Sequence, residues 1–477
     1  MLRSSISLLA AVWALGGCAT GSVQLPSLVV APGTWSEAVT SASARNVGDA
    51  AAGVQAASRW WKEMQDGELD RVMATCLRSN ADLGLAAARL QQARALADGA
   101  RAARRPRLDF GAGAARERVP RSSVRDTDGT RVRVPAYRQS RFTTELEVSY
   151  EVDLLGRLAL GQRAGEANLA ASESDWRAVK QWLAQAVVLE YGDLRIADER
   201  SFDARRSEAL LQQLLAAEHD RLRAGLGTRE AVRSAERQLA DRRDERIGLE
   251  RDRHQALSRL AILMGTTAAE VQLAPREGYF AQLGISGAVA ADLPAAVIEQ
   301  RADVAAAWQR VVASGIDAER IRLDRYPALT LTGSTGFVSQ AVRRWLAGDA
   351  LAWAAEAALQ VILLDGGRAL ARSDQAISVM SEHYAEYRKT VLQALGEVEI
   401  SLSAAVAARS RLAFAVEDSA RREADLDAAR SALAAGIGSR PLLLQAELAL
   451  TEARGAASLR RHELLSAWAG THKALGR

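Results

Sequence analysis

The sequence predicts a mostly α-helical chain with a small membrane-type β part, built as a tandem repeat. Three observations predict this fold class. The segment 224–229 (AGLGTR) recurs as 435–440 (AGIGSR), an offset of 211 positions. In both copies a helical pattern of about 68 residues runs from a Gly-Arg pair to the first glycine of that segment, and a helix of this length spans about 100 Å. Four shorter runs alternate between apolar and polar side chains, as strands do.

The first 18 residues predict an export signal. Arg3 supplies the positive end, an apolar run spans 6–15, and the small pair Gly16-Gly17 precedes Cys18. This ending resembles the bacterial lipobox, in which the cysteine becomes the lipid-bearing N-terminus after cleavage, so Cys18 is the expected lipid anchor. Ala19 in the next position favours sorting to the outer membrane. The alternative is an ordinary signal peptide whose cysteine is incidental.

Composition excludes several classes of protein. A net charge of +4 over 477 residues, with no basic patch interleaved with aromatics, argues against nucleic-acid binding. Cys18 and Cys76 are the two cysteines, so no intrachain disulfide is expected if Cys18 is acylated. After residue 18 we expect no apolar run long enough for a membrane-spanning helix. Any membrane crossing must therefore use strands.

The next segments, in order, are an arm and the first repeated helix. Residues 19–79 are expected to form an extended N-terminal arm and a short helix in which Cys76 is a packed thiol. Asn80-Ala-Asp-Leu and Arg301-Ala-Asp-Val each begin a helix of about 25 residues. Each helix ends near a proline, Pro106 or Pro327, because proline lacks the N–H and disfavours helix before it.

The period then changes to alternation, which predicts one β-hairpin in each copy, at 107–153 and 328–364. The clearest run is 142–152, with apolar side chains at even positions and acidic or polar ones at odd positions. Alternation over about ten residues is typical of membrane β-barrel strands. The alternative is a sheet with one wet face. The expected lumen-facing carboxylates are those on the polar side of these runs: Glu145, Glu147, Glu151, Asp153 and Glu356.

The loops and edges of these hairpins carry further predictions. Residues 120–136 and 339–350 are expected to be solvent-exposed loops. Four strands leave two open edges, which hydrocarbon does not tolerate, so several chains must share one barrel. A heptad-like spacing of apolar residues in the second long helix, from Tyr384 to Val406, agrees with a coiled-coil seam.

The repeated glycine segments are predicted to be the tips of two long antiparallel helical hairpins. Glycine ends a helix in the left-handed conformation without steric cost, and Thr228 and Ser439 are placed to cap the returning helices. Neither segment has the lysine of a phosphate-binding loop. The tip residues are Gly225, Leu226, Gly227, Thr228 and Arg229 in the first copy, and Gly436, Ile437, Gly438, Ser439 and Arg440 in the second.

At this point the chain resembles the TolC-like outer-membrane efflux proteins, in particular their lipoprotein branch. The resemblance covers nearly all of the mature chain and rests on LGGC ending at Cys18, Trp60-Trp61, NADL from Asn80, PxLxF from Pro106, DLLGR from Asp153, DGGR from Asp365, and the two tips. It implies a homotrimer with a twelve-stranded barrel and a twelve-helix periplasmic tunnel. The partners it implies are a periplasmic adaptor protein at the tips, an inner-membrane pump, and outer-membrane lipid.

The resemblance also implies a domain plan. After the signal (1–18) and the arm with its equatorial segment (19–79) come the first repeat (80–265), an equatorial connector (266–300) and the second repeat (301–477). Family members often carry Leu-Leu-Asp-Ala-Gln in the last helix, where the aspartate helps to close the periplasmic aperture. Here Gln445 replaces that acid, so Glu236 and Glu447 join it as aperture candidates.

The function expected from this resemblance is a passive exit duct for drugs or other small molecules. Two alternatives remain open: a type I protein-secretion duct, and a lipid-anchored helical scaffold without a pore. The histidines show no metal-ligand spacing, and no nucleophile motif is recognisable, so no enzyme activity, cofactor or metal is expected.

Overall fold

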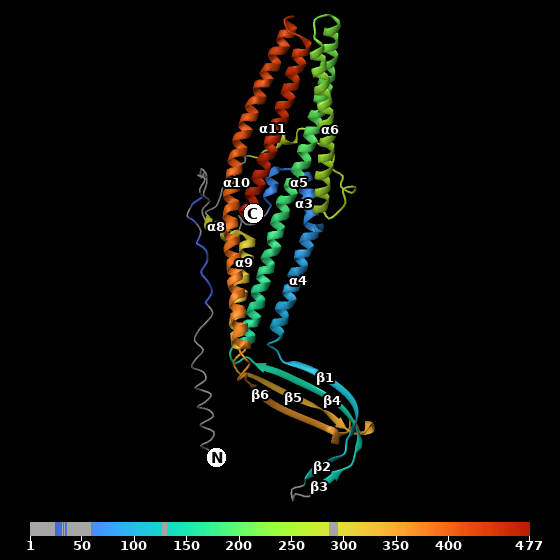
Figure 1. Cartoon of the computed structure of the whole chain (residues 1–477), viewed down its shortest axis with the longest axis vertical. Coiled ribbons are helices and arrows are strands. Elements are labelled where there is room, and N and C mark those ends of the chain that lie inside the picture. Colours follow the sequence, from blue (N-terminus) through green and yellow to red (C-terminus); the bar gives the residue numbers. More distant parts are fainter. Residues whose placement is uncertain (1–23, 31, 33, 36–58, 126–130, 286–293) are drawn as a thin grey trace. The chain divides into compact units, whose positions relative to one another are not determined.

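The computed structural model describes residues 24–30, 32, 34–35, 59–125, 131–285 and 294–477 (Figure 1). The expected lipid anchor, Cys18, lies outside these residues. The chain forms two compact units. Unit 1 contains Gln91–Ala170 and Trp308–Ala385, and unit 2 contains Leu28–Leu90, Ala171–Ala307 and Glu386–Arg477.

The predicted tandem repeat is present element by element. The first copy consists of α4 (Ala81–Ala102), β1 (Arg107–Val119), β4 (Tyr137–Val152), α5 (Arg157–Arg223) and α6 (Arg229–Leu263). The second consists of α9 (Ala302–Leu323), β5 (Ala328–Ser339), β6 (Leu351–Gln360), α10 (Arg368–Ala434) and α11 (Arg440–Ala474). Both long helices, α5 and α10, have 67 residues, and both returning helices, α6 and α11, have 35.

Unit 1 contains a four-stranded antiparallel sheet in the order β1-β4-β5-β6. The segment 120–136 is more ordered than the expected loop, because β2 (Ser122–Arg125) pairs with β3 (Arg131–Val134) as a separate ladder. The connection between β5 and β6 holds two short 3₁₀ turns, η4 (Val342–Arg344) and η5 (Gly348–Ala350). All four long strands join their helices at the same end of the sheet, and both strand connections lie at the other end.

Small residues and polar pairs join α4 to α5 within unit 1. A methyl group added at Gly165 of α5 would lie 3.4 Å from both Ala97 and Ala100 of α4, so the two helices approach closely there. Arg101 bonds Glu166 at 3.2 Å, and Arg104 bonds Gln162 at 2.8 Å. This packing holds the helices that lead into β1 and out of β4.

Unit 2 contains a large apolar core. Around α5 it gathers η3 (Trp60–Met64), α3 (Gly67–Ser79), α7 (Tyr279–Gln282) and the C-terminal part of α11. Trp60 is 2% exposed; it meets Trp468 edge-on with ring centroids 5.0 Å apart and stacks on His472 at 4.9 Å. Cys76 is fully buried in this core, as the sequence predicts, and desolvation raises the pKa of its thiol to about 12.

A buried charge network fastens the same core. Arg195 of α5 has no exposed surface, and its guanidinium bonds Asp198 at 2.8 Å and Glu68 of α3 at 2.5 Å. It also donates to the carbonyl oxygen of Ala274, in the connector after α6, at 2.9 Å. Removing one partner of such a buried ion pair is strongly destabilising, because the remaining charge stays desolvated. Arg195 therefore ties the N-terminal helix and the connector to α5.

One sequence expectation about helices needs correction. An 18-residue window of α10 reaches a mean hydropathy of 1.4 with few charges, so α10 passes a membrane-span test by length and composition. Only 33% of that window is buried within the chain. A single such helix is weak support for a membrane span. In a helix of 67 residues, an exposed apolar stretch is also what a coiled-coil contact with a neighbouring helix requires.

Candidate functional site

The sheet separates its side chains into an apolar face and a polar face. The register pairs Leu108 with Val148, Val148 with Gly333, and Gly333 with Ala355, and these residues belong to the apolar face. Its large side chains are exposed: Phe110 is 72% exposed and Trp353 is 78% exposed. An exposed apolar surface of this kind marks a membrane or partner interface. The strand ladder thus produces the alternation predicted from the sequence.

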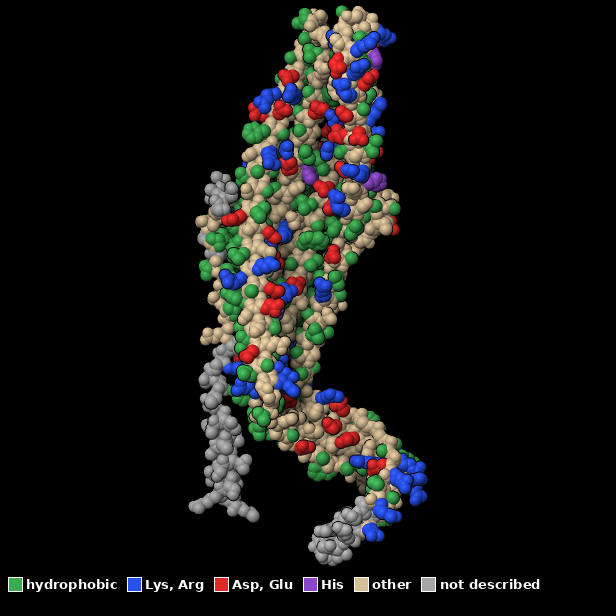
Figure 2. All heavy atoms as spheres, viewed as in Figure 1, with side chains coloured by type: hydrophobic (Ala, Val, Ile, Leu, Met, Phe, Trp, Pro, Cys, Tyr) green, Lys and Arg blue, Asp and Glu red, His purple; other side chains and the backbone are tan. Residues whose placement is uncertain are grey.

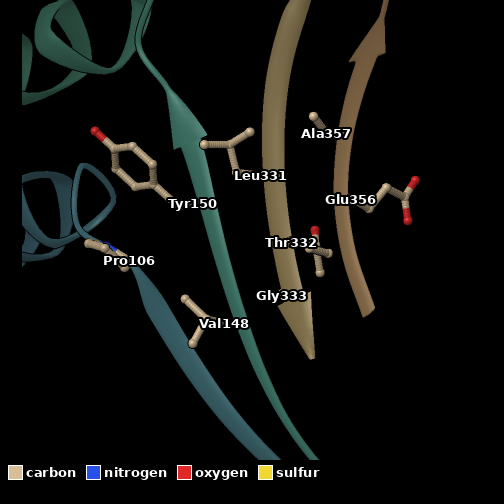
Figure 3. Close-up of a pocket in the computed structure, with 9 residues that line it drawn as sticks. Pro106, Val148, Tyr150, Leu331, Thr332, Gly333, Glu356 and Ala357 are labelled. Carbon is tan, nitrogen blue, oxygen red and sulfur yellow. The ribbon is translucent and has the colours of Figure 1, made fainter. Parts of the chain in front are cut away.

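A hollow of about 550 Å³ lies on this apolar face (Figure 3). Val148 and Tyr150 of β4 and Leu331 of β5 line it, together with Pro106, small residues of β5 and β6, and Glu356 at its rim on β6. The hollow exists because Gly333 and its neighbour Ala355 leave space between larger side chains. Thr332 and Glu356 are its polar side chains and the rest of its lining is mostly apolar, so it resembles a lipid-facing depression rather than a catalytic pocket.

Four of the five expected lumen carboxylates share the polar face. Glu145, Glu147 and Glu356 lie opposite Gly336, Ser334 and Thr332 respectively. Glu151 shares their phase on β4, and Arg157 neutralises it through two bonds of 2.7 and 2.8 Å. The small residues beside the acids leave this face open.

Asp153 has a different place from the other four acids. It follows the last residue of β4, and its carboxylate accepts hydrogen bonds from the backbone N–H groups of Leu158 at 3.0 Å and Ala159 at 2.8 Å. In the second copy Asp365 does the same for Gly367 and Ala369. These backbone N–H groups hold the pKa of Asp365 below its usual value. Asp153 is therefore a helix cap in the geometry, set apart from the strand carboxylates.

Both tips end their long helices with a left-handed glycine. Gly225 has φ +73° and Gly436 has φ +75°. The N–H of Leu226 donates to the carbonyl oxygen of Arg221 at 2.9 Å, and that of Gly225 to Leu222 at 3.1 Å, which is the Schellman pattern. The second tip repeats this pattern with Ile437 and Gly436.

The second glycine of each tip, Gly227 or Gly438, is required for a different reason, which is lack of space for a side chain. A methyl group at Gly227 would lie 2.9 Å from the backbone nitrogen of Leu222, and one at Gly438 would lie 2.7 Å from that of Leu433. Neither position tolerates a side chain without a shift of the backbone. In both tips the residue between the two glycines is apolar and exposed: Leu226 by 74% and Ile437 by 85%.

The two returning helices begin differently. Thr228 caps α6 by accepting a hydrogen bond from the N–H of Ala231 at 3.2 Å, as expected. Ser439 makes no such bond, so its expected capping role is wrong. Pro441 in the first turn of α11 has no N–H, so this turn has one donor fewer to satisfy, but Leu442, the counterpart of Ala231, keeps its N–H.

The three aperture candidates lie on α6 and α11, whose residues Leu239 and Leu444 share an apolar cluster. Glu236 and Gln445 are exposed. Glu447 is half-buried and lies 3.7 Å from Arg430. An arginine at this distance offsets the charge of Glu447, whereas among the described residues no lysine or arginine forms a salt bridge with Glu236.

The sequence comparison decides the family. The family model for outer membrane efflux proteins matches residues 72–266 and 293–477. The chain belongs to the outer membrane efflux protein family. Members of this family are outer-membrane channels, and the observed sheet with an apolar and a polar face agrees with that assignment.

Named relatives of this efflux protein cover most or all of its length. The pyoverdine export outer membrane protein OpmQ of Pseudomonas aeruginosa is 28% identical over 479 residues, covering 100% of this chain and 97% of the relative. The toluene efflux pump outer membrane protein TtgF of Pseudomonas putida is 27% identical over 353 residues, and the alignment covers 72% of this chain and 70% of TtgF.

Solved structures of efflux channels share the fold. The outer-membrane channel OprN superposes with a TM-score of 0.79 at 25% identity, covering 95% of this chain and 99% of the other. The Campylobacter jejuni CmeC outer membrane channel superposes with a TM-score of 0.80 at 18% identity, covering 96% and 95%. These likenesses confirm the predicted fold class.

Sequence reasoning missed the role of the paired residues that begin α4 and α9. Asn80 donates its side-chain amide to the carbonyl oxygen of Leu263 at 3.0 Å, and Arg301 donates to that of Ala474 at 3.1 Å. Each thus ties the start of one helix to the end of a returning helix. The signal was available, because Leu263 and Ala474 are related by the same offset as the tips.

Proposed function

We propose that three copies of this chain form the exit duct of a tripartite export system, and that the duct passively conducts small molecules across the outer membrane. The observation that carries this proposal is the sheet. It has an exposed apolar face and two open edges, at β1 and β6, whose backbone groups need partners in hydrocarbon. Pairing β6 of one copy with β1 of the next provides those partners. The names of the relatives, a pyoverdine exporter and a toluene pump, support small-molecule cargo.

We further propose that the tips dock the periplasmic adaptor protein. Leu226 and Ile437 offer exposed apolar side chains on a rigid Schellman turn, and Arg229 and Arg440 each lie three residues further on. A partner with an apolar socket edged by acidic side chains would fit both copies. The aperture acid of this system would be Glu236, since Gln445 carries no charge.

The experiment is conductance of the purified full-length protein in planar bilayers, together with native mass measurement in mild detergent. The duct requires a trimer and discrete conductance steps. A folded, predominantly monomeric protein without conductance would instead support the helical scaffold. Incorporation of palmitate at Cys18 is a separate part of the proposal, because the sheet can hold the protein in the membrane by itself.

A further inference from the structure

We propose that Arg116 and Arg118 of β1 and Arg138 of β4 form a binding site for the phosphate groups of lipids in the outer leaflet of the membrane. We call these three residues the arginine row. The inference rests on the proposed insertion of the sheet in the outer membrane. All three side chains are exposed, and Figure 2 shows Lys and Arg side chains gathered at the end of the sheet that carries the strand connections.

The arginine row continues the apolar face. Arg116 and Arg118 share the phase of Leu108 and Phe110 on β1, because side chains two residues apart point to the same face. Arg138 lies directly opposite Arg118 and therefore belongs to this face as well. On the face that contacts hydrocarbon, the apolar side chains are thus replaced by arginine side chains near one end of the sheet. That end is the outer one, since all four strands join the periplasmic helices at the other.

The height of the arginine row matches the lipid headgroups. On β4 the apolar side chains extend from Val152 to Phe142, which is about 34 Å along a strand and about 26 Å in height at a tilt of about 40°. This equals the roughly 25 Å apolar band of membrane barrels. Arg116 lies opposite Ser140 and Arg118 opposite Arg138, two and four residues beyond Phe142. They therefore stand about 5 and 10 Å past the apolar band, where the headgroups begin.

An aromatic pair marks the same boundary. Phe142 and Trp345 lie with ring centroids 5.9 Å apart. Aromatic side chains concentrate at the interfaces of membrane barrels, so the apolar band ends at this pair. A lipid lying along the face would place its acyl chains on the band and its phosphates at the arginine row.

The charge of the row calls for an anion. Arg118 and Arg138 are like charges directly opposite each other, an arrangement that destabilises a strand pair unless a counter-charge intervenes. Within the described part of the chain no carboxylate forms a salt bridge with any of the three. Glu117 points to the polar face and accepts a hydrogen bond from Gln139.

The second hairpin shows the contrast. At its outer end Arg344 pairs with Asp349 at 3.1 Å, so its charge is already offset. The arginine row has no such acid, and the arginine fork matches phosphate oxygens in two parallel bonds. An amphipathic lipid phosphate satisfies both the apolar band and the charge above it, which free phosphate does not.

The test uses the full-length trimer, stripped of lipid in detergent, with bisphosphorylated lipid A as the probe and binding followed by native mass spectrometry. The variant is Arg116→Gln/Arg118→Gln/Arg138→Gln. We expect its affinity to fall by roughly 100-fold, about five-fold for each arginine removed. Arg141→Gln is the matched control, because Arg141 is on the same strand but lies opposite Ala115 on the polar face. It should bind like the unmodified protein.

Two further arms identify the phosphate source. Dephosphorylated lipid A should bind the unmodified protein as weakly as the triple variant, and excess inorganic phosphate should compete poorly. Equal binding by the triple variant, or equal loss in the Arg141 control, overturns the site. Efficient competition by inorganic phosphate would mean a free-anion site instead. If the triple variant yields little trimer, Arg118→Gln alone, which relieves the like-charge pair, must still lose about five-fold.

Conductance separates this inference from the proposed function. An unmodified protein that conducts as a trimer yet binds lipid A no more tightly than the triple variant would refute the arginine row alone. Absence of both trimer and conductance in the unmodified protein would refute the duct.

Discussion

Replacing both tip glycines that have positive φ, in the variant Gly225→Val/Gly436→Val, should abolish adaptor docking while leaving the trimer intact. Space is no obstacle, because a methyl group built at either glycine meets nothing within 4 Å. The obstacle is the backbone: φ is +73° and +75°, where a β-branched residue is a genuine outlier. The strain is about 1–3 kcal/mol at each tip.

The chain can escape that strain by leaving the left-handed conformation. Escape breaks the two Schellman bonds of each tip, at 2.9 and 3.1 Å in the first copy, which together stabilise the turn by about 1–3 kcal/mol. The strain and the cost of escape are therefore of the same size. Each tip should spend a large fraction of time in an open form that aims Leu226 or Ile437 elsewhere. If docking needs several tips in the closed form at once, it fails, because the probability that all are closed is the product of the closed fractions of the separate tips.

The assay combines trimer content with crosslinking of the tips to the adaptor in cells. The matched control is Gly225→Asn/Gly436→Asn, since asparagine tolerates the left-handed region and should keep both docking and export. Valine variants that crosslink and export normally would refute the reasoning about conformation. Loss of trimer with crosslinking retained would mean that these glycines serve folding and that the docking surface is elsewhere.

Three other predictions concern the lumen, a buried acid and the anchor. Neutralising Glu145, Glu147 and Glu356 together should reduce any preference of the channel for cations, measured as the reversal potential in a salt gradient; an unchanged potential would place these acids outside the conduction path. Burial and the nearby Glu199 carboxylate raise the pKa of Asp203 to about 6, so the charged form destabilises the fold. The protonated form of Asp203 carries no such cost, so the protein is more stable below about pH 4 and loses this advantage as the pH rises through 6. In thermal unfolding of the trimer, Asp203→Asn should therefore be more stable than the unmodified protein by about 1–2 kcal/mol at pH 7.5, after allowance for solvent screening, and no more stable at pH 4. Cys18→Ser should abolish incorporation of labelled palmitate but leave conductance intact, and labelling that persists in the serine variant would remove Cys18 as the anchor.

The repeat made the fold predictable from the sequence. Helix lengths, strand positions and the left-handed glycines follow from period and from glycine chemistry, which act over a few residues. The glycine of the tip at position 225 is an example, since its φ follows from its place after the last helical turn.

Contacts between distant segments could not be predicted in the same way. The buried guanidinium of Arg195 bonds groups 127 residues upstream and 79 residues downstream, and a solitary arginine in a charged helix looks solvated in the sequence. The missing cap at Ser439 could not be predicted from residue type, because serine is a favoured N-cap residue and only the structure shows that its side chain accepts no bond. The arginine row could not be predicted because the clearest alternation covers only 142–152, whereas β4 begins at Tyr137 and β1 extends to Val119.

The equal lengths of the paired helices restrict how this protein can vary. With α5 and α10 both at 67 residues and α6 and α11 both at 35, the two tips of one chain are reached after the same number of turns. Deleting one residue from α5 alone would lift its tip by about 1.5 Å and rotate it by about 100°, which turns Leu226 away while Ile437 stays in place. Deleting seven residues at matching levels of all four helices would keep every face and shorten each hairpin by about 10 Å. Insertions and deletions in the long helices of related proteins should therefore occur in all four helices together, each by a multiple of seven residues. Such a set is expected in a relative that spans a narrower periplasm.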